Sequence, residues 1–492
     1  MTATRQVRRR TIPPRAAVLV ESLRDVGYSL QTAVADVIDN SVAAKASNVR
    51  LFAETHPDSP AIAILDDGCG MSEEELLEAM RPGSKSPLDR RPVHDLGRFG
   101  LGLKTASFSQ CRQVTVMTRR NGRTSCAVWD LDEVASADEW VVTLPSDYAQ
   151  IPWSGELGAT GTLVVWQKLD RLLVAVDAPT GGAELVRQLD DMARHLELVF
   201  HRYLAGERGL RRVDISLNGQ RLEPFDPFHL RHPATIRGPE ERFRVGGHVL
   251  TFQPMTLPHH SKVATKEWER YAGPEGYIKN QGFYLYRERR LIISGTWFGL
   301  ARQTELTKLA RVRIDIPNGL DAEWKIDVKK ASAQPPASVR ARLRRLVEEI
   351  GSRSTRVYTG RGSRLQSTNR LPVWIRSQDK NQVRYGVDLE HPALGHFVRQ
   401  LSPEVASEFG KVLRLVSASL PVDAIFADVG SDPRAVAGVA LENGELRDFA
   451  KKIYDTLVAA GSSRDDVLLM MSSAEPFRAN WDALQTQLDT RE

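Results

Sequence analysis

Three polar residues lie on a predicted helix whose other positions are mostly apolar. Asp36, Asp39 and Asn40 occur within the stretch AVADVIDNSVAAKA. On a helix, Asp36 and Asn40 project from one face and Asp39 lies beside them. Burying such groups is costly without partners. Mg²⁺ and a phosphate chain would provide them, with the amide oxygen on the metal and a carboxylate orienting or deprotonating water. The alternative is a polar helix face wetted by solvent.

A second polar segment, ILDDGCGMS, directly follows a predicted strand. Asp66 stands at the strand end, and Gly68, Gly70 and Met71 come after it. Glycines let the backbone approach a ligand closely. A carboxylate followed by two glycines therefore suits recognition of a planar base, and the alternative is a tight glycine turn between a strand and a helix.

A glycine-rich segment, GRFGLGLKTAS, runs into a predicted helix and contains Gly97, Gly100 and Gly102. Free backbone N–H groups at a helix N-terminus attract anions. The spacing is the reverse of the dinucleotide-binding pattern, and the segment lacks the ending of a P-loop, because Lys104 comes two residues after the last glycine. A fourth short motif, Gly161–Thr162, opens a predicted strand and alone indicates nothing.

The elements that must position these motifs alternate between helices and strands. We expect helices at residues 16–26, 30–46, 72–80, 99–110 and 183–205, and strands at 48–55, 61–65, 112–119, 124–131, 139–144 and 161–166. Helices mixed with a run of adjacent strands favour an α+β sandwich over a doubly wound sheet.

Residues 211–352 form a second mixed unit. Asn218-Gly219 between alternating apolar residues predicts a hairpin over 211–222. We expect a further hairpin at 282–293, strands at 311–316 and 324–328, and a helix at 337–350. The next segment is rich in Gly, Ser and Arg without apolar period, which indicates a linker or an exposed basic loop. A smaller module that ends in helices follows.

Composition limits the class of protein. The chain has 492 residues, of which 26% are charged and 41% hydrophobic, and this predicts a globular protein of two to four domains. It contains no long apolar run and no secretory signal, so we expect no membrane association. Cys69, Cys111 and Cys126 lack metal-binding spacing and favour a reducing cytoplasm. A net charge of +5 weakly favours an anionic partner.

The order of the four motifs resembles the Bergerat-fold ATPases, the superfamily of DNA gyrase B, Hsp90, histidine kinases and MutL. This resemblance implies ATP and Mg²⁺ as cofactors. By it, Asp66 binds the adenine amino group, Thr162 supports Asp66, and Asn40 holds Mg²⁺. The implied nucleotide-binding residues further comprise Gly68, Gly70 and Met71 at the base, Gly97, Gly100, Leu101 and Gly102 around the phosphates, and Lys104 near a phosphate. Residues 81–96 occupy the place of the ATP lid.

The second unit resembles the transducer domain, similar to ribosomal protein S5, of the gyrase, MutL and Hsp90 branch. That branch sends a lysine to the γ-phosphate, and Lys329 and Lys330 stand at the matching strand end. The choice between the two stays open, as does a solvated basic strand end. Histidine kinases fit poorly, because no helical hairpin with a phosphoacceptor His precedes the ATPase segment. We therefore expect an ATPase domain over residues 1–208, a transducer over 209–352, a basic linker over 353–372 and a C-terminal module of unknown role over 373–492.

GRFGLGLKTASFSQC, GTLVVWQKLD and QGFYLYRERRLI resemble MORC-type ATPases, particularly their stand-alone bacterial relatives. This implies an ATP-dependent homodimer that clamps DNA, in the company of restriction–modification or phage-defence proteins. Basic segments that suit DNA are Arg8 to Arg10, residues 340–346 and Arg353, Arg356, Arg361 and Arg364, although each run also suits a solvated face. The alternatives are an Hsp90-like chaperone machine and a nucleotide-gated scaffold that does not hydrolyse ATP.

One departure from the superfamily concerns the general base. Most members have Glu where this chain has Asp36. The shorter side chain sets the carboxylate back by roughly 1 Å, and a displacement of that size costs on the order of 100-fold in rate. We expect Asp36 to support slow hydrolysis, since a carboxylate is retained; an ATP-binding switch with little turnover is the other outcome.

Overall fold

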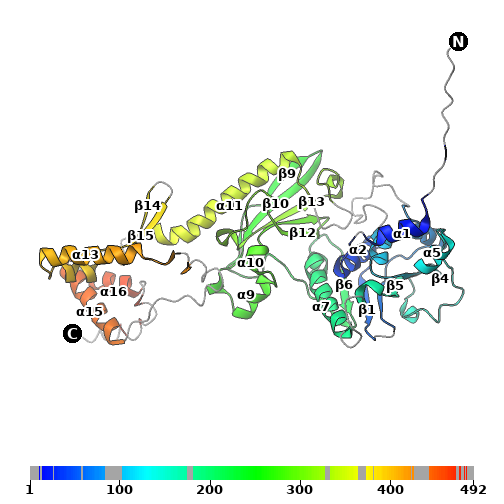
Figure 1. The fold of residues 1–492 in the computed structure, drawn as a ribbon, viewed down its shortest axis with the longest axis horizontal. Helices are drawn as coiled ribbons and strands as arrows, with labels where there is room; N and C mark the ends of the chain where they lie inside the picture. The colour runs from blue at the N-terminus through cyan, green and yellow to red at the C-terminus, as the bar shows by residue number, and fades with distance from the viewer. Residues whose placement is uncertain are drawn as a thin grey trace, which may run out of the picture. The chain divides into compact units, whose positions relative to one another are not determined.

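The computed structural model describes residues 10, 14–25, 27–56, 59–83, 102–173, 181–326, 333–363, 373–379, 382–422, 424–425, 443–472, 476–477, 481 and 484. The chain divides into two units, residues 1–350 and 351–492. Figure 1 shows the order of their helices and strands. Among the described residues, no helix is both long and apolar enough to cross a bilayer.

A seven-stranded sheet forms the first part of the first unit, in the order β4-β3-β5-β2-β1-β6-β7. Its strands are β1 (Asn48–Glu54), β2 (Ala61–Asp66), β3 (Gln113–Arg120), β4 (Arg123–Asp130), β5 (Gly161–Gln167), β6 (Asp214–Leu217) and β7 (Gln220–Arg221). Neighbouring strands are antiparallel except β1 and β6, which are parallel. The result is a mixed α+β domain, as expected from the sequence.

Both faces of this sheet are covered. Ile62 and Ile64 of β2 join the core beneath the principal helices α1 (Ala16–Arg24), α2 (Leu30–Ala43), α4 (Gly102–Phe108) and α7 (Gly181–Val199). Ala63 and Leu65, which alternate with them, pack on the opposite face against residues of the segment 148–157. Because side chains of a strand alternate between faces, β2 is buried along its whole length. The remaining helices of this part are α3 (Glu73–Met80), α5 (Leu131–Ala137), α6 (Asp170–Leu173) and α8 (His201–Leu204).

Two sequence-based expectations about this domain are corrected. The strand expected at 139–144 is wrong, since only Thr143 forms an isolated bridge, with Val128. The hairpin expected at 211–222 does form, as β6 and β7, but it extends the first sheet instead of joining the second unit expected from residue 209.

A second sheet follows, in the order β12-β11-β13-β10-β8, with β9 also paired to β10. Its elements are β8 (Ile236–Arg237), β9 (Glu241–Val245), β10 (His248–Thr256), α9 (Thr265–Ala272), α10 (Gly276–Lys279), β11 (Gly282–Arg287), β12 (Arg290–Thr296) and β13 (Ala310–Ile316). The expected hairpin at 282–293 is confirmed as β11–β12. Helix α11 (Ala337–Ser363) contributes Val339, Leu343 and Leu346 to the core of this sheet.

The strand expected at 324–328 is wrong over its described part. Residues 321–325 form turns, and Lys325 has a positive φ of 47°. Trp324 is fully buried in the core of the second sheet. The apolar residue at this position is therefore explained by a buried turn and not by a strand. The expected basic linker also differs, because α11 continues to Ser363; residues 364–372 lie outside the described part.

The C-terminal unit, residues 351–492, contains a hairpin and helices. Its elements are β14 (Trp374–Asp379), β15 (Gln382–Val387), α12 (Pro392–Val398), α13 (Pro403–Ala418), α15 (Asn443–Ala459) and α16 (Arg464–Ser472). Leu446, Ile453 and Val467 belong to its hydrophobic core. The C-terminal module is therefore mostly helical, as expected.

Candidate functional site

Helix α2 presents two buried carboxylates and one exposed amide. It begins after Ser29, whose backbone belongs to a capping box that satisfies the first turn. Asp36 and Asp39 are 4% and 1% exposed, whereas Asn40 is exposed. The hydroxyl of Tyr28 donates a hydrogen bond to Oδ2 of Asp36 at 3.0 Å. Asn40 is thus accessible to a ligand, while Asp36 is held in place within the protein.

Asp66, at the end of β2, is fixed through both carboxylate oxygens. The Ser41 hydroxyl donates to Oδ2 at 2.8 Å, and the Gly68 amide donates to Oδ1 at 2.9 Å. Burial raises the pKa of the Asp66 carboxyl above its ordinary value, although these hydrogen bonds and one from the Thr162 backbone oppose the shift. Each carboxylate oxygen accepts more than one hydrogen bond, so the group retains capacity for a ligand donor.

The neighbouring carboxylate, Asp67, has a different use. Its Oδ1 accepts hydrogen bonds from the Ser47 and Asn48 amides at 2.7 and 2.9 Å, and its Oδ2 accepts one from the Asn48 side chain at 2.7 Å. Asp67 therefore anchors the start of β1, and Asp66 remains the candidate of the pair for ligand recognition.

The turn after Asp66 lies closely against the neighbouring strands. Gly70 has a φ of +64°, and a Cβ there would lie 2.2 Å from the Arg119 carbonyl oxygen, so only glycine fits. The Met71 amide donates to Thr118 Oγ1 at 2.9 Å, and this hydroxyl lies 3.2 Å from that of Thr162. Thr118 thus links the expected base-binding turn to the expected supporting threonine.

Only part of the expected phosphate site lies within the described residues. Gly102 begins α4, and a Cβ there would lie 3.7 Å from Oδ2 of Asp36, so this glycine is beside the candidate base. Lys104 is 4% exposed and its Nζ donates to the Arg81 carbonyl oxygen at 2.6 Å. Gly97, Gly100, Leu101, most of the lid at 81–96, and the candidate lysines Lys329 and Lys330 lie outside the described residues.

The structure joins Asp66 to helix α2 through Ser41, which directly follows Asn40 and donates to the Asp66 carboxylate. Four contributing residues were missed from the sequence: Tyr28, Ser41, Thr118 and Arg290. Ser41 directly follows Asn40, and this position next to the motif was the only feature of the sequence that could have indicated its role.

Arg290 enters this site from the second sheet. Its Nε lies 3.2 Å from Oδ1 of Asp39, and its Nη2 lies 3.8 Å from Oδ1 of Asp36. The arginine and both carboxylates are almost completely buried. No local pattern pointed to Arg290, since its partners are far away in the chain.

The donor set suits Mg²⁺ only together with a phosphate ligand. Across the described ranges, no three His, Cys, Asp or Glu side chains gather as a metal-binding group. Mg²⁺ usually keeps several waters and takes few protein ligands in addition to substrate phosphates. The exposed amide of Asn40 and the nearby carboxylate of Asp36 fit that pattern.

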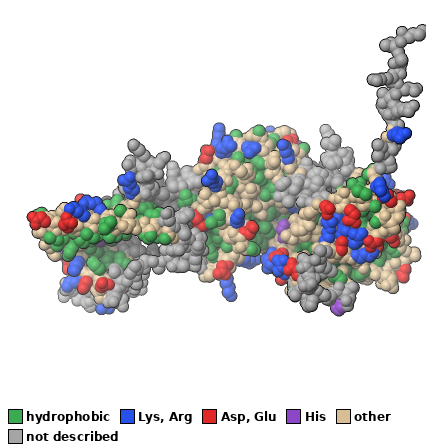
Figure 2. Space-filling view, in the orientation of Figure 1, with side chains coloured by type: hydrophobic (Ala, Val, Ile, Leu, Met, Phe, Trp, Pro, Cys, Tyr) green, Lys and Arg blue, Asp and Glu red, His purple; other side chains and the backbone are tan. Residues whose placement is uncertain are grey.

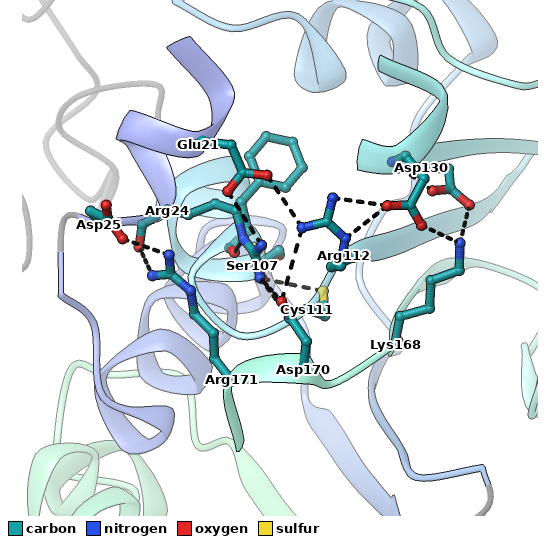
Figure 3. Close-up of polar contacts among 12 residues, drawn as sticks. Glu21, Arg24, Asp25, Ser107, Cys111, Arg112, Asp130, Lys168, Asp170 and Arg171 are labelled. Atoms are coloured by element: carbon teal, nitrogen blue, oxygen red, sulfur yellow. Dashed lines mark hydrogen bonds and ion pairs between the residues drawn. The ribbon is translucent and has the colours of Figure 1, made fainter. Parts of the chain in front are cut away.

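A separate charged network secures helix α1 (Figure 3). The buried Arg24 guanidinium donates to the Phe108 carbonyl oxygen at 2.9 Å and to Asp170 at 2.5 Å, which ties α1 to the end of α4 and to α6. Arg112 bridges Glu21 and Asp132 nearby. Figure 2 shows Lys or Arg and Asp or Glu side chains intermixed on this part of the molecule. The network therefore stabilises the domain and is no uniformly basic surface.

Comparison with known proteins identifies the domain. Residues 28–157 match the family of histidine kinase-, DNA gyrase B- and HSP90-like ATPases. The mouse protein ATPase MORC2B is 29% identical over 119 residues, which is 23% of this chain and 12% of the relative. The Caenorhabditis elegans protein ATPase morc-1 is 29% identical over 91 residues, which is 18% of this chain and 10% of the relative. The matches thus span about a tenth of each relative's length. The chain carries a Bergerat-fold ATPase domain of this family and is consistent with a MORC-type ATPase.

Proposed function

We propose that the protein binds ATP with Mg²⁺ and hydrolyses it slowly, and that ATP binding closes a homodimer around DNA. The observation that carries the nucleotide site is Asp66. Its buried carboxylate is held by Ser41 and Gly68 at a strand end, and Ser41 directly follows Asn40 on α2. In this site Asp66 accepts a hydrogen bond from the adenine amino group, and Gly68, Gly70 and Met71 line the base.

Asn40 and Asp36 have different roles at the phosphate end of the proposed site. The exposed Asn40 amide would hold Mg²⁺, which neutralises phosphate charge when bound. Asp36 would orient the attacking water and take its proton. The Tyr28 hydroxyl and Arg290 both contact Asp36 and leave its short side chain little freedom to advance. Slow turnover is the expected result.

The remaining expected ligands complete the proposal. Gly97, Gly100, Leu101 and Gly102 wrap the phosphates, Lys104 reaches one of them, and Thr162 supports Asp66. Residues 81–96 act as the lid. Either Lys329 or Lys330 senses the γ-phosphate and reports its presence to the second sheet.

DNA binding is proposed from charge and from resemblance. Arg340, Arg344 and Arg345 are exposed on α11, whereas Arg342 is paired with Glu241. The exposed arginines are available to phosphates, and binding through them weakens as salt rises. A role beside restriction–modification or phage-defence proteins is part of the same proposal.

Calorimetry with ATP and Mg²⁺ tests the nucleotide site. We expect Asn40→Ala and Asp66→Ala to abolish binding that the wild type shows, while Asp190→Ala, an exposed change on α7, retains it. Unchanged affinity of Asn40→Ala would refute the metal assignment, and a wild type that binds no ATP would refute the whole proposal.

The clamp is tested by measuring molecular size with ATP, ADP and a non-hydrolysable analogue, with and without DNA. We expect a dimer with ATP or the analogue and a monomer with ADP. An oligomeric state that does not respond to nucleotide would refute the clamp. ATP-dependent suppression of aggregation without salt-sensitive DNA binding would instead support a chaperone. An Asp36→Asn variant that retains ATP-driven dimerisation and biological activity would support a scaffold.

A further inference from the structure

Arg290 belongs to the second sheet but places its charge beside the candidate general base. It begins β12, yet its guanidinium contacts Asp39 at 3.2 Å and Asp36 at 3.8 Å on α2. Its Nη1 donates to the Leu291 carbonyl oxygen at 2.9 Å, and the charge lies 5.8 Å from the centre of the Phe200 ring. The guanidinium is therefore oriented by several contacts.

The turn that delivers Arg290 has an uncommon backbone. Arg287 pairs with Arg290 in the hairpin, so Glu288 and Arg289 form a two-residue turn. Both have positive φ values, 47° and 67°, although turns of this kind favour Asn and Gly. Such conformations persist where the surroundings hold them. The contacts around the turn must therefore hold its backbone in this conformation.

Residues 201–208, which follow α7, contain the groups that hold this turn. The Tyr203 hydroxyl donates to the Glu288 carbonyl oxygen at 2.7 Å, and Arg289 donates to the Arg208 carbonyl oxygen at 3.0 Å. The position of the turn, and hence of Arg290, is thereby coupled to the segment after α7.

Charge balance gives Arg290 more than a packing role. Two buried carboxylates of α2 share this guanidinium, and removing one partner of a buried ion pair leaves an uncompensated charge. Arg290 contacts Asp36 through Nη2 and Asp39 through Nε, so a single planar group spans both carboxylates. The closer contact with Asp39 fixes the position of the guanidinium, and the guanidinium in turn lies beside the Asp36 carboxylate.

We propose that Arg290 is a positioning residue for Asp36: it orients the carboxylate for proton transfer and makes ATP turnover depend on the seating of the β11–β12 turn. This inference rests on the proposed function, since it assigns the catalytic carboxylate to Asp36. Arg290 itself contacts neither nucleotide nor water in this scheme.

The test separates turnover from binding in full-length protein. We expect Arg290→Gln to lower kcat by about 10- to 100-fold, because misplaced catalytic groups cost rates of this order. The Kd of ATP, measured by calorimetry, stays within about threefold, because that change removes no expected nucleotide contact. Arg290→Lys, which keeps the charge, restores part of kcat. Arg302→Gln, a matched change at an exposed arginine between β12 and β13 that has no part in holding the turn, keeps the wild-type rate.

A double variant distinguishes positioning from simple stabilisation. Asp39→Asn combined with Arg290→Gln removes one negative and one positive charge, so it folds even where Arg290→Gln alone does not. We expect its melting temperature to return towards that of wild type while kcat stays low compared with Asp39→Asn alone. Recovery of rate together with stability would overturn the inference. So would wild-type turnover in Arg290→Gln, with the ATPase proposal still standing; a wild type without turnover would overturn both.

Discussion

The Nε of Arg290 lies 3.2 Å from Oδ1 of Asp39, although 251 positions separate the two residues in the chain. Both side chains are almost completely buried. Helix α2, which carries the candidate catalytic and metal-binding residues, is therefore in direct polar contact with the second sheet. The candidate nucleotide site and the second sheet share one buried charge cluster.

Asp36→Asn separates catalysis from binding. The amide matches the carboxylate in shape but accepts no proton, so we expect kcat to fall by on the order of 100-fold or more. ATP affinity should stay within about threefold, because Asp36 is assigned to the water and not to the nucleotide. Phosphate release and calorimetry measure the two quantities. Asp190→Asn on the exposed surface of α7 is the control, and equal turnover in Asp36→Asn would exclude Asp36 as the base.

Alkylation of Cys69 reports on occupancy of the base pocket. Cys69 is exposed between Gly68 and Gly70, whereas Cys111 and Cys126 are buried. Burial raises the pKa of Cys126 to about 11 and that of Cys111 well above its ordinary value, so neither thiol reacts readily. We expect maleimide to label Cys69 first and ATP to slow that labelling several-fold, as measured by peptide mass spectrometry. Labelling that is equally fast with ATP would contradict the position of the base.

Gly161→Ala should damage both stability and nucleotide binding. Gly161 has a φ of +134°, and a Cβ there would lie 2.0 Å from the Asp66 carbonyl oxygen. We expect a loss of about 2–4 kcal/mol in the free energy of unfolding, from backbone strain and steric overlap next to Asp66. Denaturant unfolding measures it. Gly155→Ala, where a Cβ would meet nothing within 4 Å, is the matched control and should change stability by less than about 0.5 kcal/mol.

Acid should weaken the contact between helix α8 and the second sheet. Burial, aided by the Arg202 charge, lowers the pKa of His201 to about 3, and its Nε2 lies 2.8 Å from the Tyr286 hydroxyl. Between the ordinary pKa of 6.5 and the folded value, the unfolded chain binds the proton and the folded chain does not. The free energy of unfolding therefore falls as pH drops, by about 1.4 kcal/mol per pH unit from this group.

His201→Gln removes this titration and should flatten the pH dependence between about pH 6 and 4. His195, whose pKa burial and Arg290 lower to about 4, contributes in the same direction and remains in the variant. Thermal melts at several pH values measure the slope. Parallel slopes for wild type and variant would contradict the assignment.

Local chemistry explains what the sequence made predictable. Asp66 stands at the end of β2, and Gly70 lies in the turn that follows. The positive φ at position 70 requires a glycine, and a glycine can be read directly from the sequence. The alternation of helical and strand patterns likewise predicted α2 and the neighbouring strands β1 and β2. The strand expected at 324–328 failed because Trp324 is buried within a turn, and burial alone produces an apolar pattern.

Arg290 was missed for a different reason. Its neighbours in the chain are further arginines and a glutamate, which is typical of a solvated turn. Only the pairing of β11 with β12, and the packing of that hairpin against the segment after α7, turns this charge towards Asp39. Contacts of this kind depend on tertiary structure and leave no local period.

The hairpin β6–β7 determines where the first sheet ends. β6 pairs in parallel with β1, and the Asn218 side chain both accepts from the Ala53 amide and donates to its carbonyl oxygen. A fragment that stopped at residue 208 would leave β1 as an open edge, with unpaired backbone groups that invite other chains to add on. Fragments used for isolated nucleotide-binding studies should therefore extend beyond Leu222, or self-association through β1 would imitate a dimer that ATP had no part in forming.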